Sequence, residues 1–349
     1  MRRLVVLVLV VIMLPSGAAL NTYAEDSDEL KFEESEFEKK PFSISGYVEL
    51  FPSLYVVDGK SALYRLRYYK NAPGNPYADA YLRLQPELSF EKGIFKAFVR
   101  AYETFGYSNH QWPFDLRLYE GYITLKPNQH IIIDAGKKTL KWGKGYAWNP
   151  VAFIDRPKNP DDPDLSYEGY TVASADFIAS FTGPLKTISF TPVVLPVYNK
   201  LNDSFGKSGH WNFAGRLYLL FYDTDIDFIF IAGTNKISKY GIDLSRNITT
   251  SFEIHGECAV IPGYKKRHLS DIGLMRERTI TAVSALAGIR YLTEIETTII
   301  LEYYYNGSGM SNSEMFNYYN FIDTAYYSYR ASKKNEILFK YASGISEGG

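Results

Sequence analysis

Cysteine is almost absent from this sequence of 349 residues. Cys258 is the only one, so no disulfide can form within the chain. Long apolar runs are also scarce, because after residue 24 none approaches the ~18 residues that a membrane-spanning helix needs. These absences exclude a helical membrane protein and a fold held together by its own disulfides.

Charge of one sign is not in excess either. The formal net charge is −1, which gives no electrostatic reason to expect nucleic acid as a partner. Glycine and lysine crowd together in residues 136–150 (GKKTLKWGKGYAWNP), but the phosphate-binding spacing G-x-x-x-x-G-K-[ST] is missing, and no G-x-G-x-x-G follows a strand and opens a helix. We therefore expect no cofactor.

Catalytic and metal-binding patterns are weak. No G-x-S-x-G elbow occurs between a strand and a helix, and among the five histidines only His255 lies in the middle of a predicted strand. Its neighbours Glu253 and Glu257 recur at every second residue, which places them about 6.6–7 Å apart along a strand. That spacing is too wide for adjacent pairs to bind one small ion without help. The sequence predicts neither an enzyme nor a metal site.

The N-terminus carries a secretory signal. A basic Met1–Arg3 precedes the apolar run Leu4–Leu14, and small residues follow at 22–24, with 16–18 as an alternative cleavage site. No cysteine follows the run, so a lipid anchor is not expected. The predicted division is a signal peptide over 1–24, a charged flexible lead over 25–40 and one β-domain over 41–349.

Alternation of polar and apolar residues fills the mature chain. In residues 79–91 one set of alternate positions is mostly polar and the other mostly apolar, as in a strand with two different faces. Around Arg117–Glu120 the alternation slips by one, which indicates either a bulge or an error in the assumed strand register. The predicted strands are 42–57, 77–90, 94–105, 113–126, 130–142, 170–182, 187–198, 211–222, 226–235, 240–246, 250–261, 278–292, 295–306 and 335–343. Residues 62–70 are expected to add extended structure.

Connection lengths alternate along this series of strands. Long connections follow the odd-numbered predicted strands, as at 58–76 and 143–169, and short ones follow the even-numbered strands, as at 91–93. Outer-membrane barrels have short periplasmic turns and long outer loops. We expect an all-β fold, an antiparallel transmembrane β-barrel of about 14 strands or slightly more, in the bacterial outer membrane. A water-soluble sandwich or solenoid is the alternative, but no fixed repeat supports a solenoid.

The C-terminus departs from this pattern. Such barrels usually finish on a strand with a terminal aromatic residue, whereas this chain ends LFKYASGISEGG. Two interpretations remain open: a last strand at Ile337–Ala342 with a short tail, or a barrel that is incomplete within this sequence.

Three short motifs resemble segments of porin-like bacterial outer-membrane barrels. Gly136–Gly143 is similar to a G-[RK]-x-x-x-x-W-G pattern that ends a strand before a long Pro- and Asp-rich outer loop. Tyr119–Gly121 and the strand ending Glu302–Gly307 are also similar to such proteins. The resemblance implies a porin-like or exporter-like barrel, with outer-membrane lipid and the barrel assembly machinery as partners.

Charged and aromatic residues supply the candidate site. Basic residues in lipid cost about 2–4 kcal/mol each at mid-bilayer, so mid-strand charges are expected to face the lumen and to pair across the pore. The lumen candidates are Arg83, Arg100, Glu253, His255, Glu257, Arg290 and Glu302. The constriction or mouth candidates are Lys138, Trp142, Lys144, Tyr146 and Trp148. The 143–169 connection either folds inward as a constriction or forms an outer loop bordered by snorkelling lysines.

These features predict a porin-like channel for small hydrophilic solutes or an export conduit. The alternative is a non-transporting barrel that acts as a surface anchor or a glycan-binding module through its outer loops. The aromatic residues 315–330 are expected to form an outer loop. That loop either packs over the barrel mouth or stacks against a glycan.

Overall fold

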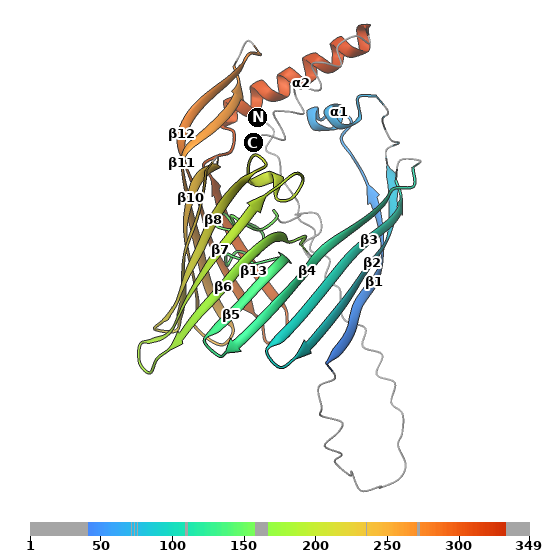
Figure 1. The fold of residues 1–349 in the computed structure, drawn as a ribbon. Coiled ribbons are helices and arrows are strands. Elements are labelled where there is room, and N and C mark those ends of the chain that lie inside the picture. The colour runs from blue at the N-terminus through green and yellow to red at the C-terminus, as the bar shows by residue number, and fades with distance from the viewer. Residues whose placement is uncertain are drawn as a thin grey trace, which may run out of the picture. The chain divides into compact units, whose positions relative to one another are not determined.

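Strands dominate the part of the chain that the structure describes. In this computed structural model that part is residues 41–332, without 71, 73, 75, 109–110, 158–166, 235 and 271–272. Thirteen strands form one antiparallel sheet in which each strand pairs with its neighbours in sequence (Figure 1). The predicted segments 1–24, 25–40 and 335–343 lie outside the described residues.

The strands and helices have the following bounds. The strands are β1 (Phe42–Tyr55), β2 (Tyr77–Lys92), β3 (Phe95–Tyr107), β4 (Phe114–Asn128), β5 (Ile131–Lys138), β6 (Tyr170–Ser180), β7 (Leu185–Val197), β8 (His210–Phe221), β9 (Thr224–Gly233), β10 (Lys236–Asn247), β11 (Phe252–Leu269), β12 (Met275–Leu292) and β13 (Thr298–Asn306). The helices are α1 (Ala62–Tyr68), the 3-10 turn η2 (Asp203–Phe205) and α2 (Asn312–Ser332). None of the described helices has the length and apolar character needed to cross a bilayer.

The antiparallel sheet is confirmed, and each of its strands overlaps a predicted one. The sheet is not closed among the described residues, because the order runs from β1 to β13 without a pairing between these two strands. The protein is mostly β rather than all-β, since two helices are present.

The two faces of the sheet differ in chemistry. On β2, Leu82 and Leu88 are exposed while Gln85 between them is buried, the reverse of a water-soluble sheet. Residues 139–157, which we call the cross-sheet segment, lie against the polar face, and we call this the covered face. The opposite face carries exposed aliphatic and aromatic side chains on successive strands, and we call it the apolar face.

The slip of the alternation in β4 is a bulge. Arg100 of β3 pairs with Glu120, but the next residue, Ala101, pairs with Leu118, so Tyr119 is the extra residue. The carbonyl of Tyr119 accepts a hydrogen bond from the backbone N–H of Gly169, just before β6, at 2.9 Å. The bulge therefore links β4 to the chain entering β6 beyond the point at which β5 has ended.

Strand β5 ends at Lys138, earlier than the predicted end at residue 142. The backbone N–H of Thr139 donates to the Glu120 carboxylate at 2.8 Å, so side-chain acceptors replace the β-ladder from this residue onward. Lys141 has a positive φ of 54°, which a strand does not allow. The chain leaves the sheet here and begins the cross-sheet segment.

The predicted connection over 262–277 is mostly strand instead. It continues the β11–β12 hairpin, which pairs as far as Leu269 and Met275 with a register shift between Ile261 and Tyr264. Proline and glycine at 262–263 interrupt the alternation, and this hid the continuation from the sequence pattern.

Both helices contradict the sequence predictions. Residues 62–70 were expected to be extended but contain α1, and the expected outer loop at 315–330 lies within α2. A capping box begins α2: the Ser311 N–H donates to the Glu314 carboxylate at 2.7 Å, and the Glu314 N–H donates to the Ser311 hydroxyl at 3.4 Å. Figure 1 shows both helices at the end of the sheet where β11 meets β12.

The helices pack on each other through charge and apolar contact. Arg65 of α1 pairs with Asp323 of α2 at 2.6 Å. Ile322 of α2 is fully buried and clusters with Leu269 at the end of β11 and with Leu66 of α1. We call α1 and α2 together the helical cap.

Candidate functional site

The cross-sheet segment touches strands far apart in the sheet. Thr139 bonds to Glu120 of β4, Lys144 lies beside Asp227 of β9, and the Tyr146 N–H donates to Glu302 of β13. A single segment can reach β4, β9 and β13 only because the sheet curves around it. The segment is therefore enclosed by the covered face.

Carboxylates satisfy the backbone of this segment. Nine of its N–H groups donate to four carboxylates, from Thr139, Leu140, Lys141, Trp142, Lys144, Gly145, Tyr146, Ala147 and Val151. An irregular chain that crosses the face of a sheet has no ladder to pair with, and unpaired buried N–H groups are costly. Acidic side chains take the place of a neighbouring strand.

Asp155 closes the first turn of the segment on itself. Its carboxylate accepts the N–H groups of Leu140 at 3.2 Å, Lys141 at 3.0 Å and Trp142 at 2.8 Å. Burial raises the pKa of Asp155, and the three backbone donors oppose that rise. Consecutive N–H groups converging on an anion form a nest, and the left-handed Lys141 gives the backbone the required bend.

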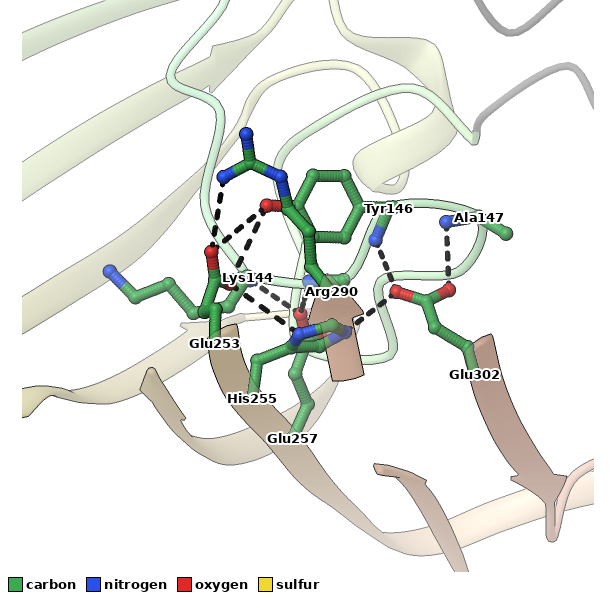
Figure 2. Close-up of polar contacts among 9 residues, drawn as sticks. Lys144, Tyr146, Ala147, Glu253, His255, Glu257, Arg290 and Glu302 are labelled. Carbon is green, nitrogen blue, oxygen red and sulfur yellow. Dashed lines mark hydrogen bonds and ion pairs between the residues drawn. The ribbon is translucent and has the colours of Figure 1, made fainter. Parts of the chain in front are cut away.

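Glu257 and Glu302 hold the middle of the segment, as Figure 2 shows. The Glu257 carboxylate accepts the N–H groups of Lys144 and Gly145, both at 2.6 Å, and that of Val151 at 3.3 Å. Glu302 accepts the N–H groups of Tyr146 and, at 2.8 Å, Ala147. Charge-assisted bonds of this kind are stronger than neutral ones. Glu257 and Glu302 therefore fix the position of residues 144–151, and we call these two acids the anchor.

His255 of β11 lies beside the anchor, between Glu253 of its own strand and Glu302 of β13. Its side chain is fully buried, with Nε2 2.9 Å from Glu302 and Nδ1 3.5 Å from Glu253 (Figure 2). Glu253 also pairs with Arg290 at 3.4 Å and accepts the Tyr146 hydroxyl at 3.2 Å. Burial, followed by the Glu253 charge, raises the pKa of the Tyr146 hydroxyl.

Lys144, whose backbone N–H binds Glu257, also forms ion pairs through its side chain. The Lys144 Nζ atom lies 3.0 Å from Asp227 and 4.0 Å from Asp243, and both carboxylates are almost fully buried. The same ammonium lies over the Tyr218 ring, 5.7 Å from its centroid. Lys144 is therefore held by two acids that neighbouring strands present to it.

Apolar side chains fill the remaining space between segment and sheet. Trp142, Val151 and Ile154 of the segment are buried in one cluster with Leu195 of β7 and Ile231 of β9. Full burial of such side chains contributes about 1.5–3 kcal/mol each. The segment is packed as a core element rather than draped over the sheet.

A cavity remains beside the segment, on the side of β3 and β13. Its volume is about 690 Å³. It is lined by basic side chains and aromatic rings, among them Arg100, Lys141, Arg156, Tyr146, Trp148 and Tyr304. The rings of Trp148 and Tyr304 are stacked, with centroids 5.7 Å apart and planes 18° from parallel.

Every lumen candidate from the sequence lies on the covered face. Their register positions place them on the same face as the buried Gln85, Glu120 and Ser284. Arg83 pairs with Glu49 at 3.2 Å, and Arg100 pairs with Glu87 and Glu120, both at 2.7 Å. Pairing across a pore was the wrong expectation, because these partners sit on adjacent strands.

The constriction candidates divide into two groups. Trp142, Lys144, Tyr146 and Trp148 all belong to the cross-sheet segment and face β8–β13 through the contacts above. Lys138 remains in β5, where it pairs with Asp134 at 2.5 Å and lies over the Tyr122 ring. Whether these residues line a pore stays a prediction.

Four acidic residues of the site were not predicted: Glu120, Asp155, Asp227 and Asp243. Glu120 lay in a segment with ambiguous alternation, and Asp155 lay in a connection without a pattern. Asp227 and Asp243 alternate with apolar neighbours (IDFIF, GIDLS), which was a usable signal for the covered face. Among the described residues, no group of three His, Cys, Asp or Glu side chains could hold a metal ion.

No protein-family model and no curated protein matches the chain. The site must therefore be interpreted from its own geometry.

Proposed function

We propose that this chain is an outer-membrane β-barrel channel for small hydrophilic solutes, narrowed from within by the cross-sheet segment. The observation that carries the proposal is the pairing of a polar, occupied face with an apolar, exposed face on the same strands. An outer-membrane barrel needs this arrangement, with apolar side chains toward lipid and polar ones inside.

The apolar face supports a lipid contact. Large apolar side chains are exposed on nearly every strand of the sheet, at Val48, Leu50, Leu82, Leu88, Val99, Ile123, Ile133, Phe177, Phe190, Phe213, Phe228, Phe230, Ile242, Leu244, Val283, Ile289 and Leu301. Exposed apolar patches beyond a few hundred Å² are rare on soluble monomers. A band that continues across successive strands favours hydrocarbon as the solvent of this face.

Aromatic residues support two membrane interfaces. Exposed rings occur near the short turns at Phe90, Phe181, Phe221, Tyr222 and Tyr291, and near the opposite strand ends at Phe105, Trp112, Trp211, Tyr240 and Tyr305. Outer-membrane barrels carry aromatic girdles at both interfaces. The strand length between these rings, shortened by the strand tilt of about 35–45°, then spans the apolar layer of the membrane.

Closure of the sheet is part of the proposal. In a meander of thirteen strands β1 and β13 run in the same direction. Their outer edges cannot stay unpaired in hydrocarbon. In the proposed barrel one further strand, antiparallel to both, joins these two edges; the strand predicted over 335–343 lies outside the described residues.

The segment supports a constriction. It is tied to the covered face by six charge-assisted backbone bonds and by a buried apolar cluster. In a closed barrel this anchoring places it across the bore, where selection depends on pore width and on the lining charges. The cavity beside it is the remaining path.

Planar-bilayer recording tests this function. The protein is refolded in detergent, checked for a heat-modifiable band on a gel, and added to a bilayer. We expect stable single-channel steps, and larger steps when residues 144–156 are replaced by a short Gly-Ser linker. Silence from folded protein contradicts transport and favours a surface anchor, whereas unchanged conductance in the linker variant contradicts the constriction.

A further inference from the structure

The cavity beside the cross-sheet segment has a specific chemistry. Three of its lining side chains are basic, at Arg100, Lys141 and Arg156, and one is acidic, at Asp155. Aromatic side chains of the segment and of β13 supply much of the remaining surface. A cavity that combines cations with flat rings differs from a water-filled gap, so its charges and rings must be examined separately.

Most of these charges already have partners. Arg100 is neutralised by Glu87 and Glu120 on the neighbouring strands. The Asp155 carboxylate accepts three backbone N–H groups, so its acceptor sites are largely occupied. The acidic residue therefore does little to attract a cation into the cavity.

The positive charges of Lys141 and Arg156 are only partly neutralised by the described acids. Among the described residues Lys141 forms no ion pair, and its side chain is exposed. Among the described residues Arg156 pairs with Glu168 at 3.8 Å and lies over the Tyr170 ring, 4.3 Å from its centroid. Glu168 also pairs with Lys137 and with Arg117, and Arg117 has Asp115 at 2.7 Å as a second partner. Two acids for three cations leave an excess of one positive charge among these described side chains at the cavity edge.

The rings offer a flat apolar surface next to that charge. Trp148 stacks on Tyr304 and is still 45% exposed. Tyr146 lines the same cavity and is 36% exposed. Exposed aromatic faces in a cavity bind flat rings by stacking.

We propose that this cavity is a binding site for a small organic anion that carries a flat ring. The anionic group pairs with Lys141 and Arg156, and the ring lies against Trp148. The inference rests on the proposed function, since it names the class of solute that the channel selects. A neutral sugar stacks on the rings but forms no ion pair with the two cations. An inorganic anion pairs with the cations but leaves the rings exposed to water.

Calorimetric titration of the refolded protein in detergent micelles tests the binding directly. The probes are benzoate, cyclohexanecarboxylate, which has the charge without the flat ring, and benzyl alcohol, which has the ring without the charge. We expect benzoate to bind about tenfold more tightly than benzyl alcohol and about fivefold more tightly than cyclohexanecarboxylate. Equal affinities, or no binding of benzoate at millimolar concentration, overturn the proposal.

Variants assign the two halves of the site. Lys141→Gln is expected to weaken benzoate about tenfold and to leave benzyl alcohol unchanged. Trp148→Leu is expected to weaken benzoate and benzyl alcohol alike. Lys126→Gln removes an exposed lysine near the short-turn end of β4 and serves as the matched control. If Lys126→Gln weakens benzoate as much as Lys141→Gln does, the effect is general charge and the site is refuted.

Bilayer recording separates this inference from the function on which it rests. Benzoate is expected to block wild-type steps in a concentration-dependent manner and to block Lys141→Gln steps less. Conducting channels that benzoate does not block refute the binding site but still support the proposed channel function. Selective benzoate binding in micelles by a protein that never conducts supports the site and refutes transport.

Discussion

Asp227 and Asp243 face each other directly across β9 and β10, and both are about 1% exposed. Like charges in opposed positions of a sheet are destabilising. The Lys144 ammonium, 3.0 Å from Asp227 and 4.0 Å from Asp243, offsets that repulsion from the cross-sheet segment. The segment therefore stabilises the sheet at this point by supplying the cation, and the sheet stabilises the segment by supplying the two acids.

Lys144→Met is expected to lower the stability of the folded protein by about 3 kcal/mol, because it leaves two buried carboxylates without their cation. The measurement is the midpoint of urea-induced unfolding in micelles. Asp243→Asn in the same background is expected to restore part of the loss, since a neutral amide of similar shape replaces one of the two opposed acids. If the double variant is as unstable as Lys144→Met, or less stable, the three side chains do not form a coupled unit.

Glu257→Ala and Glu302→Ala are expected to release the middle of the segment, since each deletes the acceptor of at least two backbone N–H groups. We expect higher and noisier single-channel conductance in both variants. Glu277→Ala, which removes an exposed acid of β12 that pairs with Lys265, is the control. Conductance traces identical to wild type in both anchor variants contradict the assigned role of the anchors.

Gly288→Ala is expected to displace His255. An added Cβ at this position of β12 comes within 2.1 Å of His255 Nε2, the atom that contacts Glu302. The substitution thus perturbs the anchor without altering a polar group, and it should increase conductance noise as Glu302→Ala does. Gly59→Ala is the control, because its nearest contact is 3.8 Å away. A quiet channel in Gly288→Ala, equal to wild type, rules out a role for the His255 position.

The helical cap is expected to loosen in acid. Burial opposes ionisation of Glu314, but Lys266 at 2.8 Å and the bonds from Ser311 outweigh it and lower the pKa to about 2, from an ordinary 4.5. A carboxyl with a depressed pKa contributes stability that is complete above its unfolded pKa and is lost as pH falls. Docking of α2 should therefore be constant above pH 4.5 and weaken toward pH 2.

A spin label at the exposed Thr324, in a Cys258→Ser background, reports the mobility of α2. We expect mobility to rise between pH 4.5 and pH 2 in the wild-type cap, and to be raised already at pH 7 in Glu314→Gln. Glu294→Gln, an exposed acid in the turn before β13, should leave the profile unchanged. A mobility independent of pH in this window excludes Glu314 as the acid-sensitive contact.

The sheet could be predicted because its signal is local. Each strand alternates polar and apolar residues over its own length, and the short turns between paired strands are marked by sequences such as Glu91–Gly93. The bulge at Tyr119 was visible as a slip in the same pattern. Helix α2 was missed because tyrosines on all sides obscure its period, although Ser311 and Glu314 form a capping box in the sequence.

The anchor could not be predicted from its residues one at a time. Mid-strand acids such as Glu257 were expected to meet basic side chains, yet they meet the backbone N–H groups of a segment more than 100 residues away. No composition or period encodes such a partner, since every residue offers the same N–H group. Only the arrangement of sheet and segment together shows that these acids replace a missing strand.

The hydrogen bond between the Tyr119 carbonyl and the Gly169 N–H ties the chain that enters β6 to β4. Lys138, the last residue of β5, pairs with Tyr170, the first residue of β6, so strand pairing holds both ends of the insertion. The sheet thus fixes where the chain leaves β5 and where it enters β6, and the acids of the covered face fix residues 144–151 between these points. A variant that loses these acids therefore frees the middle of the insertion while both of its ends stay paired.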